Sequence, residues 1–221
     1  MPLPLSPEAI AQLLQPYLAE AALPAPMFPQ LAVYLELILK WNARINLTAI
    51  RKPEEIVRRH FGESLFTGLH LATNEAVRHG QAPPIPPSDF LLDLGSGAGF
   101  PGIPIQLLRP DRPVTLAESR SRKAAFLREV VRVLGLKTEV WAARAEAMQA
   151  DRQFDTVTLR AVDEMGSAVA EAARRATCRI AILGIRRAAY TTLPASFRLA
   201  EPIALPDSRD GILLIARRDT E

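Results

Sequence analysis

The sequence predicts an α/β fold: a mostly parallel sheet with helices on both faces, an antiparallel last strand and an N-terminal helical extension. Three observations carry this prediction. After residue 89, short apolar runs alternate with amphipathic helical stretches, which is typical of parallel strands joined by helical crossovers. The last two apolar runs follow one another with only a turn between them, which indicates an antiparallel pairing. The first 80 residues show helical periodicity alone.

Residues 1–80 are predicted to form a helical N-terminal cap. The first helix is expected to begin at Pro7, because proline is tolerated at the first helical position. A second helix is expected over residues 31–45, where apolar side chains recur every three to four positions. A third is expected to begin near Pro53, where two following glutamates suit the positive end of the helix dipole.

Residues 81–88 are rich in proline and are predicted to be a junction, because they can form neither a helix interior nor a central strand. Residues 89–221 then form the main domain, with helices expected over 123–134 and 165–176. Parallel strands are expected at Phe90–Leu94, Val114–Ala117, Thr138–Trp141, Thr156–Leu159 and Arg179–Leu183, and the closing antiparallel pair at 197–205 and 211–216.

The composition excludes several classes of protein. The chain has 221 residues, 48% of them hydrophobic and 23% charged, which is a globular balance. Cys178 is the only cysteine, so no disulfide can form within the chain. The apolar runs are too short to cross a bilayer, and no basic residue precedes Lys40 as it would in a signal peptide. We therefore expect a cytoplasmic protein without a membrane or disulfide partner.

The most specific segment is the glycine-rich loop at 95–102, which follows the first predicted strand and opens a helix. Its glycines allow a tight turn and let a ligand approach the backbone. A dinucleotide fingerprint can be read on its last three glycines, but that reading begins late, past the strand end. Read from the strand end, Asp93, Gly95 and Gly97 are similar to the first motif of S-adenosylmethionine-dependent methyltransferases. A carboxylate such as Asp93 would repel a pyrophosphate, which favours this second interpretation.

Polar residues follow the next three strands, at the edge where open α/β sheets bind ligands. Glu118 ends the second strand, and a carboxylate there can accept both ribose hydroxyls of either nucleoside cofactor. Ala145 and Glu146 follow the third strand, where related sheets hold an adenine edge. Arg160 follows the fourth strand, although an ordinary surface arginine is an equally good interpretation of its position alone.

Together these segments closely resemble one family, the bacterial 16S rRNA guanine-N7 methyltransferases, also called the glucose-inhibited division protein B family. The glycine loop alone is typical only of a class. Its continuation Phe100-Pro101-Gly102-Ile103-Pro104 makes the match specific. The other matching segments are Lys40-Trp41-Asn42, Asn46-Leu47-Thr48, Arg59-His60 with Ser64, Glu118-Ser119, Phe126-Leu127 and Arg160-Ala161. The chain departs from the family's usual residues at Glu63, often Asp, and at Leu183, often Lys.

The resemblance implies a Rossmann-like class I methyltransferase sheet and S-adenosylmethionine as the cofactor. It implies methylation of N7 of the guanine at position 527 of 16S rRNA. It also implies that Gly95, Phe100, Ala145, Glu146 and Arg160 contact the cofactor. With Gly97 and Glu118 from the motif and the strand end, these are the predicted cofactor-binding residues.

The expected chemistry needs no catalytic acid or base. Guanine N7 carries an in-plane lone pair and no proton, so attack on a methyl group requires alignment rather than deprotonation. Cys178 lies in an apolar strand and is expected to be a core residue rather than a nucleophile. The three histidines do not have the spacing of metal ligands, so no metal site is predicted.

Arg58, Arg59 and His60 form a basic stretch on the third predicted helix and are predicted to bind RNA. The alternative is a solvated helix face with His60 packed at its edge. Arg186 and Arg187 are a second candidate pair. The expected partner is 16S rRNA or the small ribosomal subunit, bound by a monomer. Three other functions stay open: a methyltransferase of the same fold acting on a small molecule or protein, an NAD-binding oxidoreductase, and a non-catalytic RNA-binding module.

Overall fold

The computed structural model describes residues 4–18, 21–76, 89–162, 164–185 and 193–219. The predicted junction at 81–88 lies outside these residues, as do Arg186 and Arg187. The division into a cap at 1–80 and a main domain at 89–221 therefore stays a prediction.

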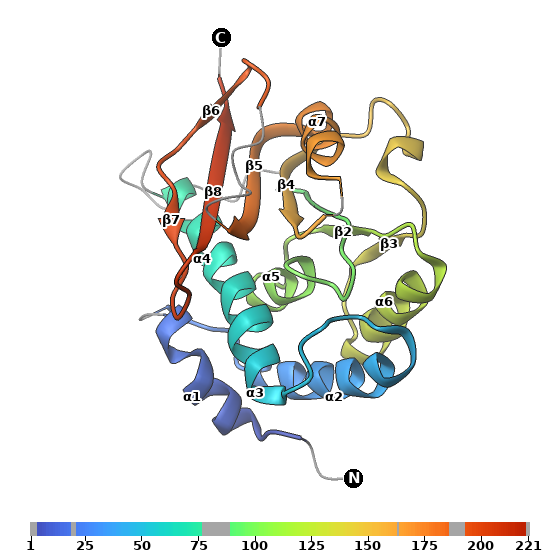
Figure 1. Cartoon of the computed structure of the whole chain (residues 1–221), viewed down its shortest axis with the longest axis vertical. Coiled ribbons are helices and arrows are strands. Elements are labelled where there is room, and N and C mark those ends of the chain that lie inside the picture. The colour runs from blue at the N-terminus through green and yellow to red at the C-terminus, as the bar shows by residue number, and fades with distance from the viewer. Residues whose placement is uncertain (1–3, 19–20, 77–88, 163, 186–192, 220–221) are drawn as a thin grey trace.

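A single sheet organises the molecule, as predicted, but it has eight strands rather than seven because the strand expected over 197–205 is divided into two short strands (Figure 1). Its strands are β1 Leu91–Leu94, β2 Val114–Ala117, β3 Glu139–Trp141, β4 Phe154–Arg160, β5 Ala176–Ile185, β6 Phe197–Leu199, β7 Ile203–Ala204 and β8 Gly211–Arg218. The order is β3-β2-β1-β4-β5-β8-β6, and β7 also pairs with β8. The first five strands are parallel, whereas β8 runs antiparallel to β5, which confirms the predicted last strand.

The order of the strands fixes where a ligand can bind. From β1 the chain builds one half of the sheet through β2 and β3, and it then crosses back to β4 and β5 on the other side of β1. In open α/β sheets the crevice at such a switch point, beyond the carboxyl ends of the strands, is the usual ligand site. The carboxyl ends of β1 and β4 are therefore the place to look for a binding site.

The helices agree with the predicted periodicity in most places. They are α1 Pro7–Leu18, α2 Met27–Ile45, α3 Pro53–Glu55, a π-helix η1 Ile56–Gly62, α4 Glu63–Ala76, α5 Gly102–Leu108, α6 Ser121–Leu134, a short 3-10 helix η2 Ala145–Ala147 and α7 Met165–Arg175. The helix expected from Pro53 is thus three consecutive segments with a π-helix in the middle. Such π segments are rare in proteins, and those that occur are often found at functional sites.

Alternate residues of the strands face the two helical layers. On β5, Ala181 and Leu183 join a core with the N-terminal helices, whereas Ile180 and Ile182 join the core under α7. The N-terminal helices lie on the same face as α5 and α6, with α4 against α5 and α2 against α6 (Figure 1). The apolar core therefore runs without interruption from α1 to β1. Among the described residues, no helix combines the length and hydropathy that crossing a membrane would need.

The expectation that Cys178 is a core residue is wrong, because its side chain is exposed. The register between β4 and β5 shifts between Phe154 and Thr156, so that two residues of β5 oppose one of β4. This irregularity breaks the alternation that would have turned the thiol inward. Its sulfur instead lies 3.8 Å from a carboxylate oxygen of Asp155.

Candidate functional site

A cavity of about 420 Å³ opens at the carboxyl ends of β1, β2 and β4, at the switch point of the sheet. This volume is within the range of small-molecule sites. All seven predicted cofactor-binding residues line it: Gly95, Gly97, Phe100, Glu118, Ala145, Glu146 and Arg160. Residues that are distant in the sequence therefore meet on one surface, as predicted.

The glycine loop adopts a backbone that other residues rarely reach. Gly95, Gly97 and Gly99 have φ values of +73°, +57° and +92°. The amides of Gly95 and Ser96 both donate to the carbonyl of Ala117 on β2, at 3.0 Å each. The Tyr34 hydroxyl on α2 donates to the carbonyl of Ala98, so the N-terminal helices also hold the loop. The loop is thus held by hydrogen bonds from both the sheet and the N-terminal helices.

Asp93 lies beneath this loop and stabilises it through hydrogen bonds. Its carboxylate is fully buried and accepts from the Gly102 amide at 3.1 Å and the Thr158 hydroxyl at 2.9 Å. Burial raises the pKa of this carboxyl to about 6, although the hydrogen bonds from Thr158 and Gly102 oppose the rise. Asp93 does not line the cavity, so it ties the glycine loop to β4 rather than facing a ligand.

Glu118 presents a fixed carboxylate to the cavity. Only 6% of the residue is exposed, and its oxygens accept from the Gly97 amide at 3.0 Å and the Arg120 amide at 2.7 Å. A carboxylate has about four lone-pair sites, so two amide bonds leave acceptor capacity. The position suits a pair of hydroxyl groups on a ligand.

The loop after β3 is organised by Arg175, a residue that the sequence analysis missed. Arg175 lies on α7 and is 1% exposed, and its guanidinium donates to Glu171 at 2.7 Å. It also donates to four backbone carbonyls of the loop, those of Ala145, Met148, Gln149 and Arg152. Because Ala145 and Glu146 line the cavity, this buried arginine shapes one of its walls.

Arg160 joins the cavity to the π-helix. Its guanidinium donates to the Glu63 carboxylate at 2.7 Å and to the Arg59 carbonyl at 2.9 Å. It also lies over the Phe100 ring, with 5.9 Å between the central guanidinium carbon and the ring centroid. The side chain is 13% exposed, so Arg160 is a largely buried wall residue and not an ordinary surface arginine.

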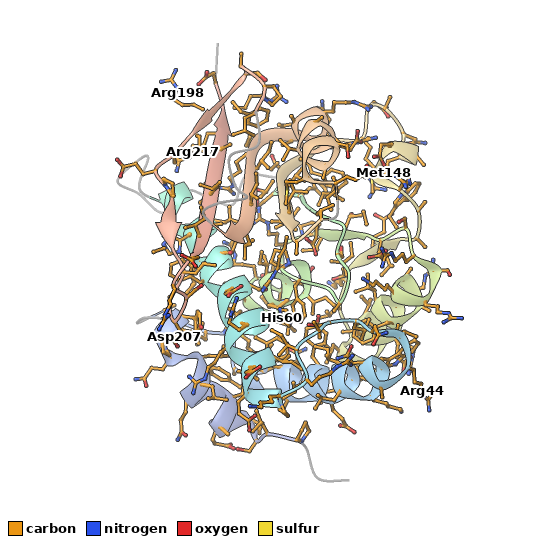
Figure 2. All side chains as sticks on the ribbon, in the orientation of Figure 1. Arg44, His60, Met148, Arg198, Asp207 and Arg217 are labelled. Carbon is orange, nitrogen blue, oxygen red and sulfur yellow. The ribbon has the colours of Figure 1, made fainter. Side chains whose placement is uncertain are left out.

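The three predicted RNA-binding residues lie on the π-helix, and none of them lines the cavity. Arg58 is 4.0 Å from the Asp207 carboxylate on the turn before β8, and Arg59 donates to Glu63 at 2.9 Å. Figure 2 labels Asp207 at this turn, beside the N-terminal helices. Both arginines are therefore already paired with carboxylates.

His60 points inward rather than to solvent. Its ring stacks on Phe100 with 4.6 Å between centroids, and Nε2 is 2.7 Å from the Thr48 hydroxyl oxygen (Figure 2 labels His60). Burial, followed by the charges of Arg160 and Arg59, lowers the pKa of the imidazole to about 3. The ring is therefore neutral at neutral pH and packs as an aromatic group between the π-helix and the cavity wall.

The Trp-Asn…Asn-Leu-Thr pattern also has a physical role. The Asn42 amide accepts from the Thr48 backbone amide and donates to the Thr48 carbonyl, each at 3.0 Å. This pair of bonds folds the loop after α2 so that Leu47 lines the cavity. Leu47, Lys123 and Arg144 are wall residues that the sequence analysis did not select. Within the described ranges, no three side chains gather in a way that could hold a metal ion.

Comparisons with known proteins agree with this geometry. The model of the GidB family, described as rRNA small subunit methyltransferase G, matches residues 27–182. The Ribosomal RNA small subunit methyltransferase G of Stenotrophomonas maltophilia (strain K279a) is 41% identical over 164 residues, which cover 74% of this chain and 70% of that protein. The protein of the same name from Xanthomonas campestris pv. campestris (strain B100) is 36% identical over 205 residues, covering 90% and 88%.

Solved structures resemble the fold at low sequence identity. Magnesium protoporphyrin IX methyltransferase from Synechocystis PCC 6803, with bound SAM, gives a TM-score of 0.55 at 14% identity, covering 84% of this chain and 97% of that one. A putative O-methyltransferase from Klebsiella pneumoniae gives 0.55 at 14%, covering 85% and 90%. These likenesses concern the fold alone, and they confirm the predicted Rossmann-like methyltransferase sheet.

Proposed function

The chain belongs to the GidB family, the rRNA small subunit methyltransferases G, and from this premise we propose that it transfers a methyl group from S-adenosylmethionine to N7 of guanine 527 in 16S rRNA. The observation that carries the proposal is the family match over residues 27–182. That range contains every one of the seven predicted cofactor-binding residues that line the cavity. The NAD-binding alternative and the other substrates are not favoured by these comparisons.

The cavity fits S-adenosylmethionine on the chemistry of its walls. The fixed Glu118 carboxylate suits ribose hydroxyls, and Ala145 with Glu146 forms the wall assigned to the adenine. The positive-φ glycine loop lets a ligand lie against the backbone. When bound, the cofactor supplies a methyl group activated by a sulfonium charge. The protein's residues then hold and orient the reactants and exclude water.

Guanine N7 needs no general base, because its lone pair is free to attack. Catalysis by this chain then consists of aligning the nucleophile with the methyl group and of preorganised electrostatics. The glycine loop held by Tyr34, the largely buried Arg160 and the stacked pair of His60 and Phe100 supply such rigidity around the cavity. We therefore assign no catalytic acid or base.

For the RNA we propose that Arg58 and Arg59 contact phosphates from the outer side of the π-helix, with His60 packed behind them. Both arginines are partly exposed, at 44% and 50% of their side chains, and can exchange a carboxylate partner for a phosphate. The net charge of +3 is too small to hold RNA by charge alone, so placed contacts must supply recognition. We also propose that the protein acts in the cytoplasm as a monomer.

A labelling assay tests the proposal. The protein is incubated with methyl-labelled S-adenosylmethionine and either small ribosomal subunits or free 16S rRNA from a strain that lacks the modification. We expect label in N7-methylguanine of that RNA, and its loss in Glu118→Ala. Glu129→Ala, which removes a carboxylate on α6 outside the cavity, should keep full activity. Absence of label from the wild-type reaction, or tight NAD binding without S-adenosylmethionine binding, would overturn the proposal.

A further inference from the structure

We infer that Glu63 is a positioning residue that holds the Arg160 guanidinium at the cavity wall and cancels its charge, so that the site admits a cationic methyl donor. The inference rests on the proposed function, because only a sulfonium donor makes this charge matter. It concerns a residue that does not line the cavity. Its action is therefore through Arg160.

Glu63 occupies the junction between the π-helix and α4 and is 4% exposed. Its two carboxylate oxygens serve two different arginines: Oε2 accepts from Arg160 at 2.7 Å and Oε1 accepts from Arg59 at 2.9 Å. Charge-assisted bonds of this kind are about twice as strong as neutral ones. A single buried carboxylate thus separates and orients two cations.

Without that carboxylate, Arg160 would keep only backbone acceptors. The remaining contacts are the Arg59 carbonyl at 2.9 Å and the His60 carbonyl at 3.5 Å, together with the face of the Phe100 ring. None of these carries a negative charge. Glu63 is the larger of the two carboxylate charges that act on Arg160, the other being the buried Asp93. Without Glu63, Arg160 would be less fully balanced and would present more positive charge to the cavity that it lines, with the Arg59 guanidinium beside it.

An unbalanced guanidinium would act differently on the two forms of the cofactor. S-Adenosylmethionine carries a sulfonium charge, whereas S-adenosylhomocysteine is a neutral thioether of nearly the same shape. Both ligands carry the same amino-acid ammonium and carboxylate, so a nearby cation distinguishes them only by repelling the sulfonium of the donor. Loss of the Glu63 charge should therefore weaken the donor selectively, whereas a merely structural defect should weaken both ligands equally.

The same charge matters during transfer. The N7 lone pair forms the new bond to the methyl carbon, the electrons of the broken carbon–sulfur bond stay on sulfur, and the positive charge passes to the purine. No proton moves in this step. Glu63 and Arg160 form an ion pair with no net charge. This part of the cavity wall can therefore lie beside the migrating positive charge without opposing it.

Calorimetric titration of the full-length protein with each ligand tests the inference. For Glu63→Gln we expect about a tenfold increase in the Kd of S-adenosylmethionine and less than about a threefold change for S-adenosylhomocysteine. Glu63→Asp keeps the charge and should restore most of the preference between the two ligands. The control Glu129→Gln removes a carboxylate paired with Arg132 away from the cavity and should change neither Kd.

A second pair of variants separates charge from folding. Combining Glu63→Gln with Arg160→Met removes both charges, and the preference between the two ligands should return toward that of the wild type. Should Glu63→Gln not fold, Arg160→Met alone serves, because it removes the cation and should not weaken S-adenosylmethionine more than S-adenosylhomocysteine.

Equal weakening of both ligands by Glu63→Gln, no weakening of either, or selective loss of S-adenosylmethionine in Arg160→Met would overturn the inference. Failure of the proposed function is a distinct result. It would appear as wild-type protein that binds S-adenosylmethionine but does not label rRNA, or that does not bind it at all.

Discussion

Arg175→Met should destabilise the protein far more than the same change at its neighbour Arg174. Both arginines pair with the same carboxylate, that of Glu171, at 2.7 Å from Arg175 and 2.9 Å from Arg174. They differ in burial, because the side chain of Arg175 is 1% exposed and that of Arg174 is 59% exposed. The comparison therefore isolates what a buried guanidinium contributes.

The magnitude follows from the groups left behind. Methionine fills much of the volume but removes the guanidinium donor from four loop carbonyls and leaves the buried Glu171 carboxylate without its main partner. The carbonyls of Ala145 and Gln149 keep a backbone amide donor, so those of Met148 and Arg152 lose most. Breaking a buried ion pair from one side costs about 3–5 kcal/mol, and each unsatisfied buried acceptor adds to this unless water reaches it. We expect a loss of about 3–5 kcal/mol for Arg175→Met. For the exposed Arg174→Met the expected loss is below about 1 kcal/mol.

Urea unfolding at pH 7, followed by far-UV circular dichroism, measures both values. The Kd of S-adenosylmethionine should also increase for Arg175→Met, because the loop that it holds carries Ala145 and Glu146 of the cavity. Equal destabilisation by the two variants would refute the reasoning, as would an unchanged free energy of unfolding for Arg175→Met.

Three further predictions follow from the geometry around the cavity. Because the pKa of Asp93 is raised to about 6, the folded form binds its proton more tightly than the unfolded chain does. The stability that this proton contributes is complete only well below the unfolded pKa of about 4, and it is lost as the pH rises through 6. Relative to Asp93→Asn, the wild type should lose about 2 kcal/mol of stability between pH 4 and 7 in urea titrations. A pH-independent difference would contradict this. Gly102→Ala should lower the free energy of unfolding by about 1–3 kcal/mol, because the new Cβ would lie 2.9 Å from the Asp93 Cβ. In Gly166→Ala the new Cβ meets open space, so the same measurement should change by less than about 1 kcal/mol. Arg58→Ala should raise the KM for rRNA and flatten its salt dependence without changing the Kd of S-adenosylmethionine; an unchanged KM would remove Arg58 from the RNA surface.

The sheet could be predicted from sequence because its signals are local. Apolar runs between helical stretches indicate the strands, and strand ends at the switch point indicate where a cavity opens. Gly95, Glu118 and Arg160 could therefore be placed at its wall from sequence alone. The register shift that exposes Cys178 leaves no such local signal, because it depends on how β4 and β5 pair.

The residues that hold the cavity walls in place could not be predicted either, because their contacts also leave no local signal in the sequence. Glu63 and Arg160 are 97 positions apart, and their contact appears only when the π-helix packs beside the end of β4. Arg175 looks like one of two adjacent arginines at a helix end until its partner carbonyls are known. The sequence therefore indicates the residues that line the cavity better than those that hold them in place.

The position of β8 within the sheet has a consequence for how the chain folds during synthesis. This strand pairs with β5 on one side and with β6 and β7 on the other, yet it follows all of the other described strands in the sequence. Until β8 emerges, the side of the ten-residue β5 that does not pair with β4 is an open edge of the sheet. Such an apolar edge can pair with other chains. The nascent protein is therefore most prone to aggregation just before its final strand closes the sheet.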